Sequence, residues 1–205
     1  MSRKVKILLG ILIPIIVICA GFGILFLTAN WPAVMNSEPP VIDFPLADST
    51  VIGSIWGYGD HNGEFHNGID FICNTSVEVI AWCKLRVKMI TTFKNEGNGF
   101  WQTNVRFQYN WKYEFEALFE PLTQNETCGN IQREAIPLKF GQIIEPGETI
   151  GTLLIFENST LLHFGAKESG TDVCAFQFFT SSAKTTFLDL WDKYGYGDSS
   201  WYDDN

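Results

Sequence analysis

Basic residues are scarce in this sequence, which has 14 lysines and arginines against 23 aspartates and glutamates. Three of the 14 bases lie within residues 1–6, where there is no acidic residue, so the rest of the chain has 11 basic and 23 acidic residues. This excess of negative charge repels nucleic acid and anionic lipid surfaces. We therefore expect no nucleic-acid partner.

Charged residues of either sign are also few, at 18% of the chain, whereas hydrophobic residues reach 46%. This composition excludes a disordered chain, which combines low hydrophobicity with high net charge. The 205 residues are too few for several domains, but they leave room for a membrane segment and one mid-sized domain.

One long stretch without charge, residues 7–29, predicts a transmembrane helix. At about 1.5 Å per residue it is long enough to cross a hydrocarbon core of roughly 30 Å. A cleaved signal peptide is the alternative, but its apolar core would be shorter and would end in small residues. The bases in residues 1–6 place the N-terminus in the cytoplasm. We therefore expect a single-pass cell-membrane protein whose domain lies outside the cytoplasm.

Cysteines number five, and Cys19 falls within the predicted helix. The other four form an even number in an oxidising compartment, which predicts up to two disulfides in one of three pairings. Buried free thiols are the alternative. The four are Cys73, Cys83, Cys128 and Cys174.

The part of the chain that follows the helix divides into a linker, a domain and a tail. Residues 30–40 contain two adjacent prolines and no hydrophobic periodicity, as expected of a linker. The domain is expected over residues 41–195. Residues 196–205 form an acidic, aromatic tail, which we expect to be a frayed terminus rather than a recognition element.

Short segments rich in valine, isoleucine, phenylalanine, tryptophan and threonine predict β-strands in the domain. They cover residues 77–82, 85–92, 103–109, 112–118, 149–156, 161–166 and 173–178. Turn signals such as Pro146-Gly147 separate them. We therefore expect a mainly β fold, an antiparallel β-sandwich or flattened barrel. Apolar residues three and four apart predict one helix, residues 183–194, near the end of the domain.

Histidines are even rarer than cysteines, with three in the chain: His61, His66 and His163. His66 and Asp70 are four residues apart, and His163 follows nearly a hundred residues later. Two imidazoles and a carboxylate suit a zinc ion. On a straight strand, residues four apart would lie about 13 Å from each other, so the chain must bend within this motif. Gly68 is the residue that permits such a bend.

Two readings of these side chains are open from the residues alone. His66, Asp70 and His163 can be three zinc ligands with a fourth position left for water. Alternatively, the two histidines hydrogen-bond within a β-rich surface domain that binds no metal.

The same residues lie in motifs that resemble a known family. The stretch His66-Asn67-Gly68-Ile69-Asp70 resembles the His-x-Gly-x-Asp signature of the lysostaphin-type zinc endopeptidases, which cut peptide cross-links in bacterial cell walls. Residues 141–151 (GQIIEPGETIG) resemble a turn region that precedes the family's second motif. Residues 161–164 (LLHF) stand where the family has His-x-His-Phe. The resemblance covers roughly residues 53–179 and implies that His66, Asp70 and His163 bind Zn²⁺.

The family's catalytic histidines have no counterparts here. Leu161 stands where the first histidine of His-x-His is expected, and residues 113–122, where a second is expected, contain none. Loss of one general acid–base group typically lowers a rate by about 10² to 10⁴. Glu116 or Glu120 can substitute as a base, although both can also be solvated strand charges. His61 can cap the fourth zinc position or act as a base, or it can be an exposed turn residue.

Two functional hypotheses follow from the sequence. The first is a membrane-anchored, extracytoplasmic zinc metalloendopeptidase that acts on peptides or cell-wall cross-links. The second is a catalytically degenerate relative that keeps the ion and serves as a binding or regulatory module for a peptide or surface polymer. The sequence determines neither the substrate nor the pairing of the cysteines.

Overall fold

The computed structural model describes residues 37–61 and 63–196 of the chain. The predicted transmembrane helix (residues 7–29), most of the predicted linker and nearly all of the predicted tail lie outside these residues. No helix among the described residues is both long enough and apolar enough to cross a membrane. The described residues belong to one compact unit that begins at Ser37.

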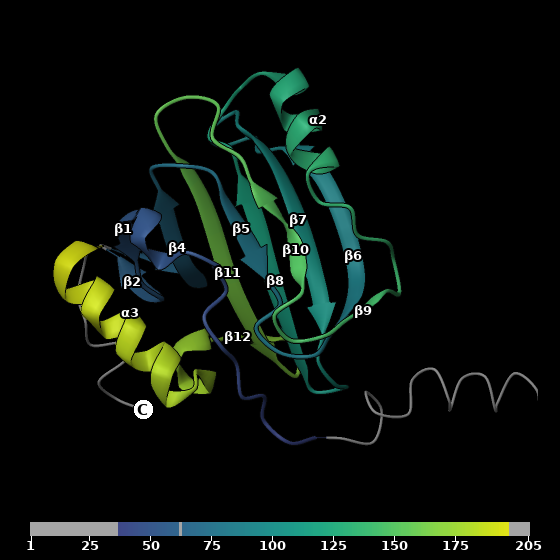
Figure 1. Ribbon diagram of the computed structural model, residues 1–205, viewed down its shortest axis with the longest axis vertical. Helices are drawn as coiled ribbons and strands as arrows, with labels where there is room; N and C mark the ends of the chain where they lie inside the picture. The colour runs from purple at the N-terminus through teal and green to yellow at the C-terminus, as the bar shows by residue number, and fades with distance from the viewer. Residues whose placement is uncertain (1–36, 62, 197–205) are drawn as a thin grey trace, which may run out of the picture. The chain divides into compact units, whose positions relative to one another are not determined.

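A nine-stranded sheet forms the larger part of this unit (Figure 1). Its strands run in the order β13-β1-β4-β11-β8-β7-β6-β9, and β12 pairs with β11. All its pairings are antiparallel except that of β1 with β13. Its strands are β1 (Ile52–Trp56), β4 (Gly68–Cys73), β6 (Leu85–Lys94), β7 (Trp101–Gln108), β8 (Tyr113–Glu120), β9 (Ile143–Ile144), β11 (Thr160–Glu168), β12 (Thr171–Val173) and β13 (Gly195–Tyr196). Because β13 and β9 do not pair with each other, the sheet is no closed barrel.

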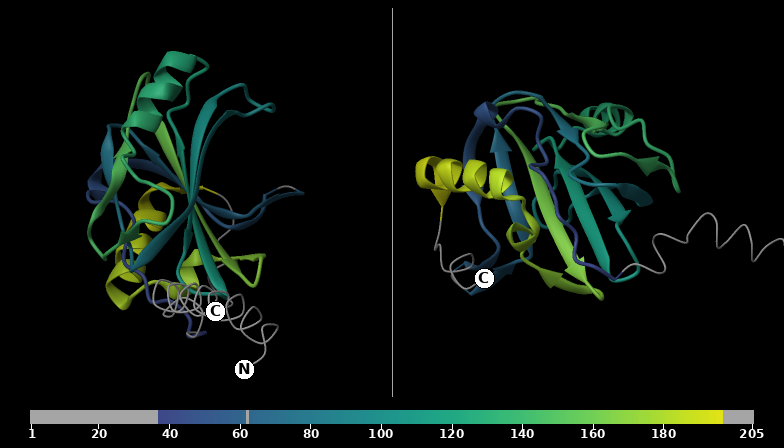
Figure 2. Two further views of the ribbon diagram at one scale, coloured as in Figure 1. Left: turned by 90° about the vertical axis from the view of Figure 1, so that its right-hand side faces the viewer. Right: turned by 60° about the horizontal axis from the view of Figure 1, so that its bottom comes forward.

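Two small sheets and four helical segments accompany the large sheet in the described part of the chain. The antiparallel pair β5 (Val77–Ile80) and β10 (Thr149–Leu153) lies over one of its faces (Figures 1 and 2). The other pair is a hairpin of β2 (Gly59–His61) and β3 (Glu64–His66). The helices are α2 (Glu126–Glu134) and α3 (Ser181–Tyr194), with 3-10 turns η1 (Ser49–Val51) and η2 (Ala175–Phe178).

Buried and partly buried side chains alternate along the central strands, so the large sheet has a core face and an open face. On β8, Tyr113, Phe115, Ala117 and Phe119 are buried, and the residues between them are only partly buried. Strand side chains point to opposite faces in turn, so the glutamates of β8 share the face opposite the core. The aromatic face therefore supplies the apolar burial, and the other face is available for chemistry.

Trp82, which follows β5, joins the small sheet to the core face of the large one. Its ring packs edge-on against Phe107, Phe115 and Phe164, with ring centroids 5.4, 5.7 and 4.7 Å away. Each such aromatic pair is worth about 0.5–1.5 kcal/mol beyond the area it buries. At the other end of the core, Phe187 of α3 packs against Phe71 of β4. Aromatic contacts thus join both the Trp82 segment and α3 to the core face of the large sheet.

Most of the predicted elements are present. Six of the predicted strands correspond to β5, β6, β7, β8, β10 and β11, and the predicted helix corresponds to α3. The strand predicted at residues 173–178 is wrong, because β12 ends at Val173 and a 3-10 turn follows it. That turn buries Phe176 and Phe178, whose bulk suggested a strand. The helix α2 and the strands β1 to β4 were not predicted.

The prediction of disulfides is wrong for the four cysteines of this unit, which are all free. Cys73, Cys83 and Cys174 are buried, and burial raises the pKa of each of these thiols to about 12. Cys128 is partly exposed on α2, which packs on β6 and β7, whereas Cys73 lies on β4, three strands along the sheet from β7. The alternative of buried free thiols therefore describes three of the four.

We expect the four thiols to differ in reactivity in the full chain carrying Cys19→Ala. The thiolate is the reactive form, so a neutral-pH thiol reagent such as DTNB should modify Cys128 in the native protein. Cys73, Cys83 and Cys174 should react only after unfolding in guanidinium, because burial keeps them protonated and covered. Four reactive thiols per unfolded chain without reductant are expected, and two or none would show that disulfides form.

Candidate metal centre

Three strands position the donors that the sequence singled out. His66 ends β3, Asp70 lies in β4, and His163 lies in β11. Asp70 and His163 are direct partners in the antiparallel ladder between β4 and β11. The chain bends at Asn67, between β3 and β4, so His66 can reach the same point although it lies outside the large sheet. The bend that the spacing required is therefore present.

The three side chains converge on one point. Nε2 of His66 lies 3.2 Å from Oδ1 of Asp70 and 3.3 Å from Nδ1 of His163, and Nδ1 of His163 lies 2.7 Å from Oδ1 of Asp70. Ligands of a tetrahedral zinc ion at about 2.0–2.1 Å are separated by roughly 3.3 Å. Two of the three separations already match that value, and the third needs to open by about half an ångström. The donors can therefore hold one metal ion with little movement.

A backbone carbonyl orients the first histidine. Nδ1 of His66 lies 2.6 Å from the carbonyl oxygen of Gly57, which can only accept a hydrogen bond. Nδ1 therefore carries a proton in both states of the ring, so Nε2 donates to Asp70 when the ring is protonated and offers a lone pair to a metal ion when the ring is neutral. Histidine ligands of metals commonly donate their other nitrogen in this way.

Gly68 makes room for the second histidine. A Cβ atom at this position would lie 2.5 Å from Cε1 and 2.6 Å from Nε2 of His163, and 2.9 Å from the backbone oxygen of Phe164. Gly68 is not among the glycines with positive φ, so the prediction that it permits the bend is corrected. Its lack of a side chain lets the His163 ring lie against the backbone of β4.

Charge within the cluster is balanced between the carboxylate and the imidazoles. Burial alone would raise the pKa of Asp70, but hydrogen bonds from His163 and His66 outweigh it and lower that pKa. Burial alone would lower the pKa of His66, but the hydrogen bond and the charge of Asp70 together raise it. A metal cation must therefore displace protons from this cluster, as is general for histidine ligands.

Glu120 lies near the cluster on the open face. It is the ladder partner of Leu161, two residues before His163, and it accepts a hydrogen bond from Nε2 of Gln102. Burial, and then the charge of Asp70, raise the pKa of Glu120 to about 7. A carboxyl group therefore stands beside the leucine where the family resemblance implies a histidine.

Glu116 and His61 have different surroundings. Glu116 is the ladder partner of Gly165 on β11 and of Arg106 on β7, and it lies on the same open face as His163. His61 ends β2, where it pairs with Glu64 of β3, but its side chain lies outside what the structure describes. The roles predicted for His61 therefore stay predictions.

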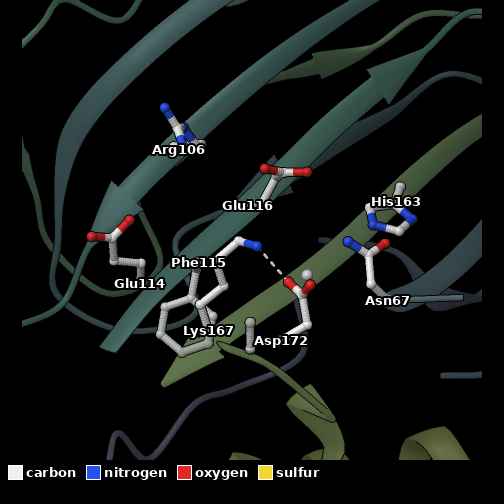
Figure 3. A pocket seen from close by; sticks show the side chains of 10 residues that line it. Asn67, Arg106, Glu114, Phe115, Glu116, His163, Lys167 and Asp172 are labelled. Carbon is white, nitrogen blue, oxygen red and sulfur yellow. Dashed lines mark hydrogen bonds and ion pairs between the residues drawn. The ribbon is translucent and has the colours of Figure 1, made fainter. Parts of the chain in front are cut away.

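A hollow opens beside His163 on the open face, and we call it the His163 hollow (Figure 3). Strands β7, β8, β11 and β12 and the bend at Asn67 supply its lining. The lining residues are Asn67, Arg106, Glu114, Phe115, Glu116, His163, Gly165, Ala166, Lys167 and Asp172. Sequence reasoning missed Arg106, Lys167 and Asp172, because only the strand register brings them beside His163.

No protein-family model matches the sequence, and no curated protein does. Among solved structures, Csd3 of Helicobacter pylori is similar over 75% of this chain and 39% of its own, with 17% identity and a TM-score of 0.50. A zinc-containing peptidase from Vibrio cholerae is similar over 66% of this chain and 39% of its own, with 18% identity and a TM-score of 0.47. The catalytic domain of lysostaphin from Staphylococcus simulans covers 65% of this chain, with 89% of its own length, 19% identity and a TM-score of 0.38.

The chain thus spans about two fifths of the length of Csd3. At 17% identity this likeness shows the fold alone. The shared fold is mainly β, built on an antiparallel-rich open sheet, and is consistent with the lysostaphin-type fold that the sequence motifs imply.

We expect zinc to raise the melting temperature of the full chain, because a ligand that binds only the native state stabilises it. The shift should be lost in His66→Ala, in Asp70→Asn and in His163→Ala, each of which removes one of the three converging donors. Differential scanning calorimetry with and without zinc measures it. An unchanged melting temperature in the wild type would support the alternative in which the two histidines only hydrogen-bond.

Gly68→Ala should weaken zinc binding by about 10- to 100-fold, the usual effect of disturbing the support of a metal ligand. The new methyl group would displace the His163 ring, since the backbone oxygen of Phe164 prevents movement the other way. Gly165→Ala is the matched control, because its Cβ would meet nothing closer than 3.5 Å. Competition with a chromogenic chelator gives both affinities, and equal losses would contradict the role assigned to Gly68.

Proposed function

We propose that this chain is a zinc metalloendopeptidase-like protein that acts on peptides or on cell-wall peptide cross-links. The single observation that supports the proposal most is the convergence of His66, Asp70 and His163 on one point. Their order and spacing also resemble the signatures of the lysostaphin-type enzymes. The predicted transmembrane helix at residues 7–29 would anchor the domain outside the cytoplasm.

His66, Asp70 and His163 are the residues that would hold Zn²⁺. Two histidines and one carboxylate leave an open position, as catalytic zinc sites do. Zinc in such a site supplies a Lewis acid that polarises a carbonyl group and lowers the pKa of a water molecule. The neighbouring side chains must then orient the peptide and move protons.

Glu120 is the best candidate for the residue that takes up a proton. Its pKa of about 7 lies near neutral pH, where a general base works best. The hydrogen bond from Gln102 holds its carboxylate on the open face, across the ladder from Leu161. Glu116 is a weaker candidate because it lines the His163 hollow beyond Gly165. Leu161 itself can neither hold a proton nor donate a hydrogen bond.

The second candidate function is a catalytically degenerate domain that binds a metal and a peptide or surface polymer without turnover. The replacement of the expected histidine by Leu161 favours it. Leu118, the ladder partner of His163 on β8, gives the cluster a second aliphatic neighbour. Leu161 thus leaves no polar group at the position where the family resemblance implies a catalytic histidine.

Hydrolysis of short glycine-rich and wall-derived peptides by the zinc-loaded full chain tests these two functions. For an active enzyme, we expect His66→Ala to abolish cleavage and Glu120→Gln to lower kcat by about 10² to 10⁴ while zinc stays bound. Glu116→Gln is the matched control and should cleave at nearly the wild-type rate. Stoichiometric zinc with no cleavage of any peptide would favour the degenerate domain.

A further inference from the structure

Three of the charged side chains that line the His163 hollow form ion pairs. Nζ of Lys167 lies 2.5 Å from Oδ1 of Asp172 across the β11–β12 hairpin, as the dashed line in Figure 3 marks. Glu114 forms an ion pair with Lys88 of β6. Two charged residues of the hollow, Arg106 and Glu116, are left without an ion pair among the described residues.

Arg106 lacks good hydrogen-bond acceptors. Its Nη2 donates to Sδ of Met89 at 3.1 Å, and thioether sulfur is a weak acceptor. Its Nε is buried and has no hydrogen-bond partner within the described chain. A guanidinium has five N–H donors in a planar fork, so most of its capacity is unused. A buried donor without an acceptor destabilises the folded state, and a bound acceptor would offset that cost.

A second unsatisfied polar atom lies two residues away. Oδ1 of Asn104 is buried and has no hydrogen-bond partner in the part of the chain that the structure describes, and it lies on the same face of β7 as Arg106. Asn104 belongs to the row of ladder partners that continues through Leu118 to His163. Unused donors and an unused acceptor thus lie two residues apart on β7, on the face of the sheet that also carries His163.

The floor of the hollow carries no side chain at Gly165. Arg106, Glu116 and Gly165 are consecutive ladder partners on β7, β8 and β11. Gly165 has no side chain, and a Cβ there would make only ordinary contacts, 3.5 Å from Cβ of Glu116 and 3.7 Å from Nε2 of His163. Neighbouring strands lie about 4.8 Å apart, so the backbone of Arg106 is roughly 10 Å from that of Gly165. The extended side chain of Arg106 and a small ligand together can bridge this distance.

We propose that the His163 hollow is a subsite for a ligand carboxylate, bound by the guanidinium of Arg106 next to the metal centre. A carboxylate matches the planar fork of arginine in a bidentate pair. Glu114, Glu116 and Asp172 line the same hollow, so a single negative charge is accommodated better than the double charge of a phosphate. Under the proposed function, such a ligand is a peptide that carries a carboxylate.

The inference deepens the proposed function, because it names carboxylate-bearing peptides as the class that the metal centre would meet. It does not depend on turnover or on zinc. A carboxylate can also bind zinc directly. The subsite is therefore tested in the chain after a chelator has removed the metal, so that any preference for carboxylates reports on Arg106.

The test compares three probes by isothermal titration calorimetry on the full, metal-free chain. N-acetyl-glycyl-glycine carries a terminal carboxylate, N-acetyl-glutamate α-amide carries a side-chain carboxylate, and N-acetyl-glycyl-glycinamide carries none. We expect one or both carboxylates to bind at least about tenfold more tightly than the neutral amide. The tighter carboxylate identifies whether the ligand group is a chain terminus or an acidic side chain.

Arg106→Met keeps the apolar stem of the side chain and should abolish the preference for carboxylates. Arg86→Gln, on β6 and outside the hollow, is the matched control and should keep it. Arg106→Met should melt at or above the wild-type temperature, since it removes an unsatisfied buried donor. If Arg106 had only a structural role, its loss would instead lower the melting temperature. Equal binding of charged and neutral probes, or an unchanged preference in Arg106→Met, would overturn the subsite whether or not zinc and cleavage are found.

Discussion

The pairing of β4 with β11 is the constraint on which the metal centre depends. It places Asp70 beside His163, although 93 residues separate them in the chain. The register is fixed from the other face, where Phe71 pairs with Leu162 and Ile69 pairs with Phe164, and all four side chains are fully buried. A slip of one residue would turn the carboxylate and the imidazole into the core and expose the aromatic face. Apolar packing on one side of the sheet therefore determines the geometry of a polar cluster on the other.

The sequence predicted the members of that cluster but not all of its support. The donor chemistry of His66, Asp70 and His163 is visible in the residue types and motifs, and the need for a bend follows from strand geometry. The reason for Gly68 could not be read in the same way, because the atoms that it avoids belong to His163, far away in sequence. Spacing identifies residues that can meet, whereas close packing shows which neighbours must be small.

The fold was predicted best where apolar and polar residues alternate regularly, as along β8. It was predicted worst where polar residues or glycines interrupt that alternation. Residues 57–68 contain four glycines and several polar residues, so β2 and β3 show no clear apolar alternation. The helix α2 is polar except for Ile131, and its one local signal is the N-cap Asn125, whose side chain accepts from the backbone of Thr127. Arg106 gave no signal at all, since its importance comes from partners that it lacks.

Folding and chemistry draw on different faces of the same strands. The inward residues of β8 and β11 supply the apolar burial that keeps the layers together, and the outward residues contribute little of it. Outward residues such as Leu161 can consequently be exchanged at little cost in stability. The reactivity of the open face is thus separable from the foldability of the chain, and the two can be engineered independently.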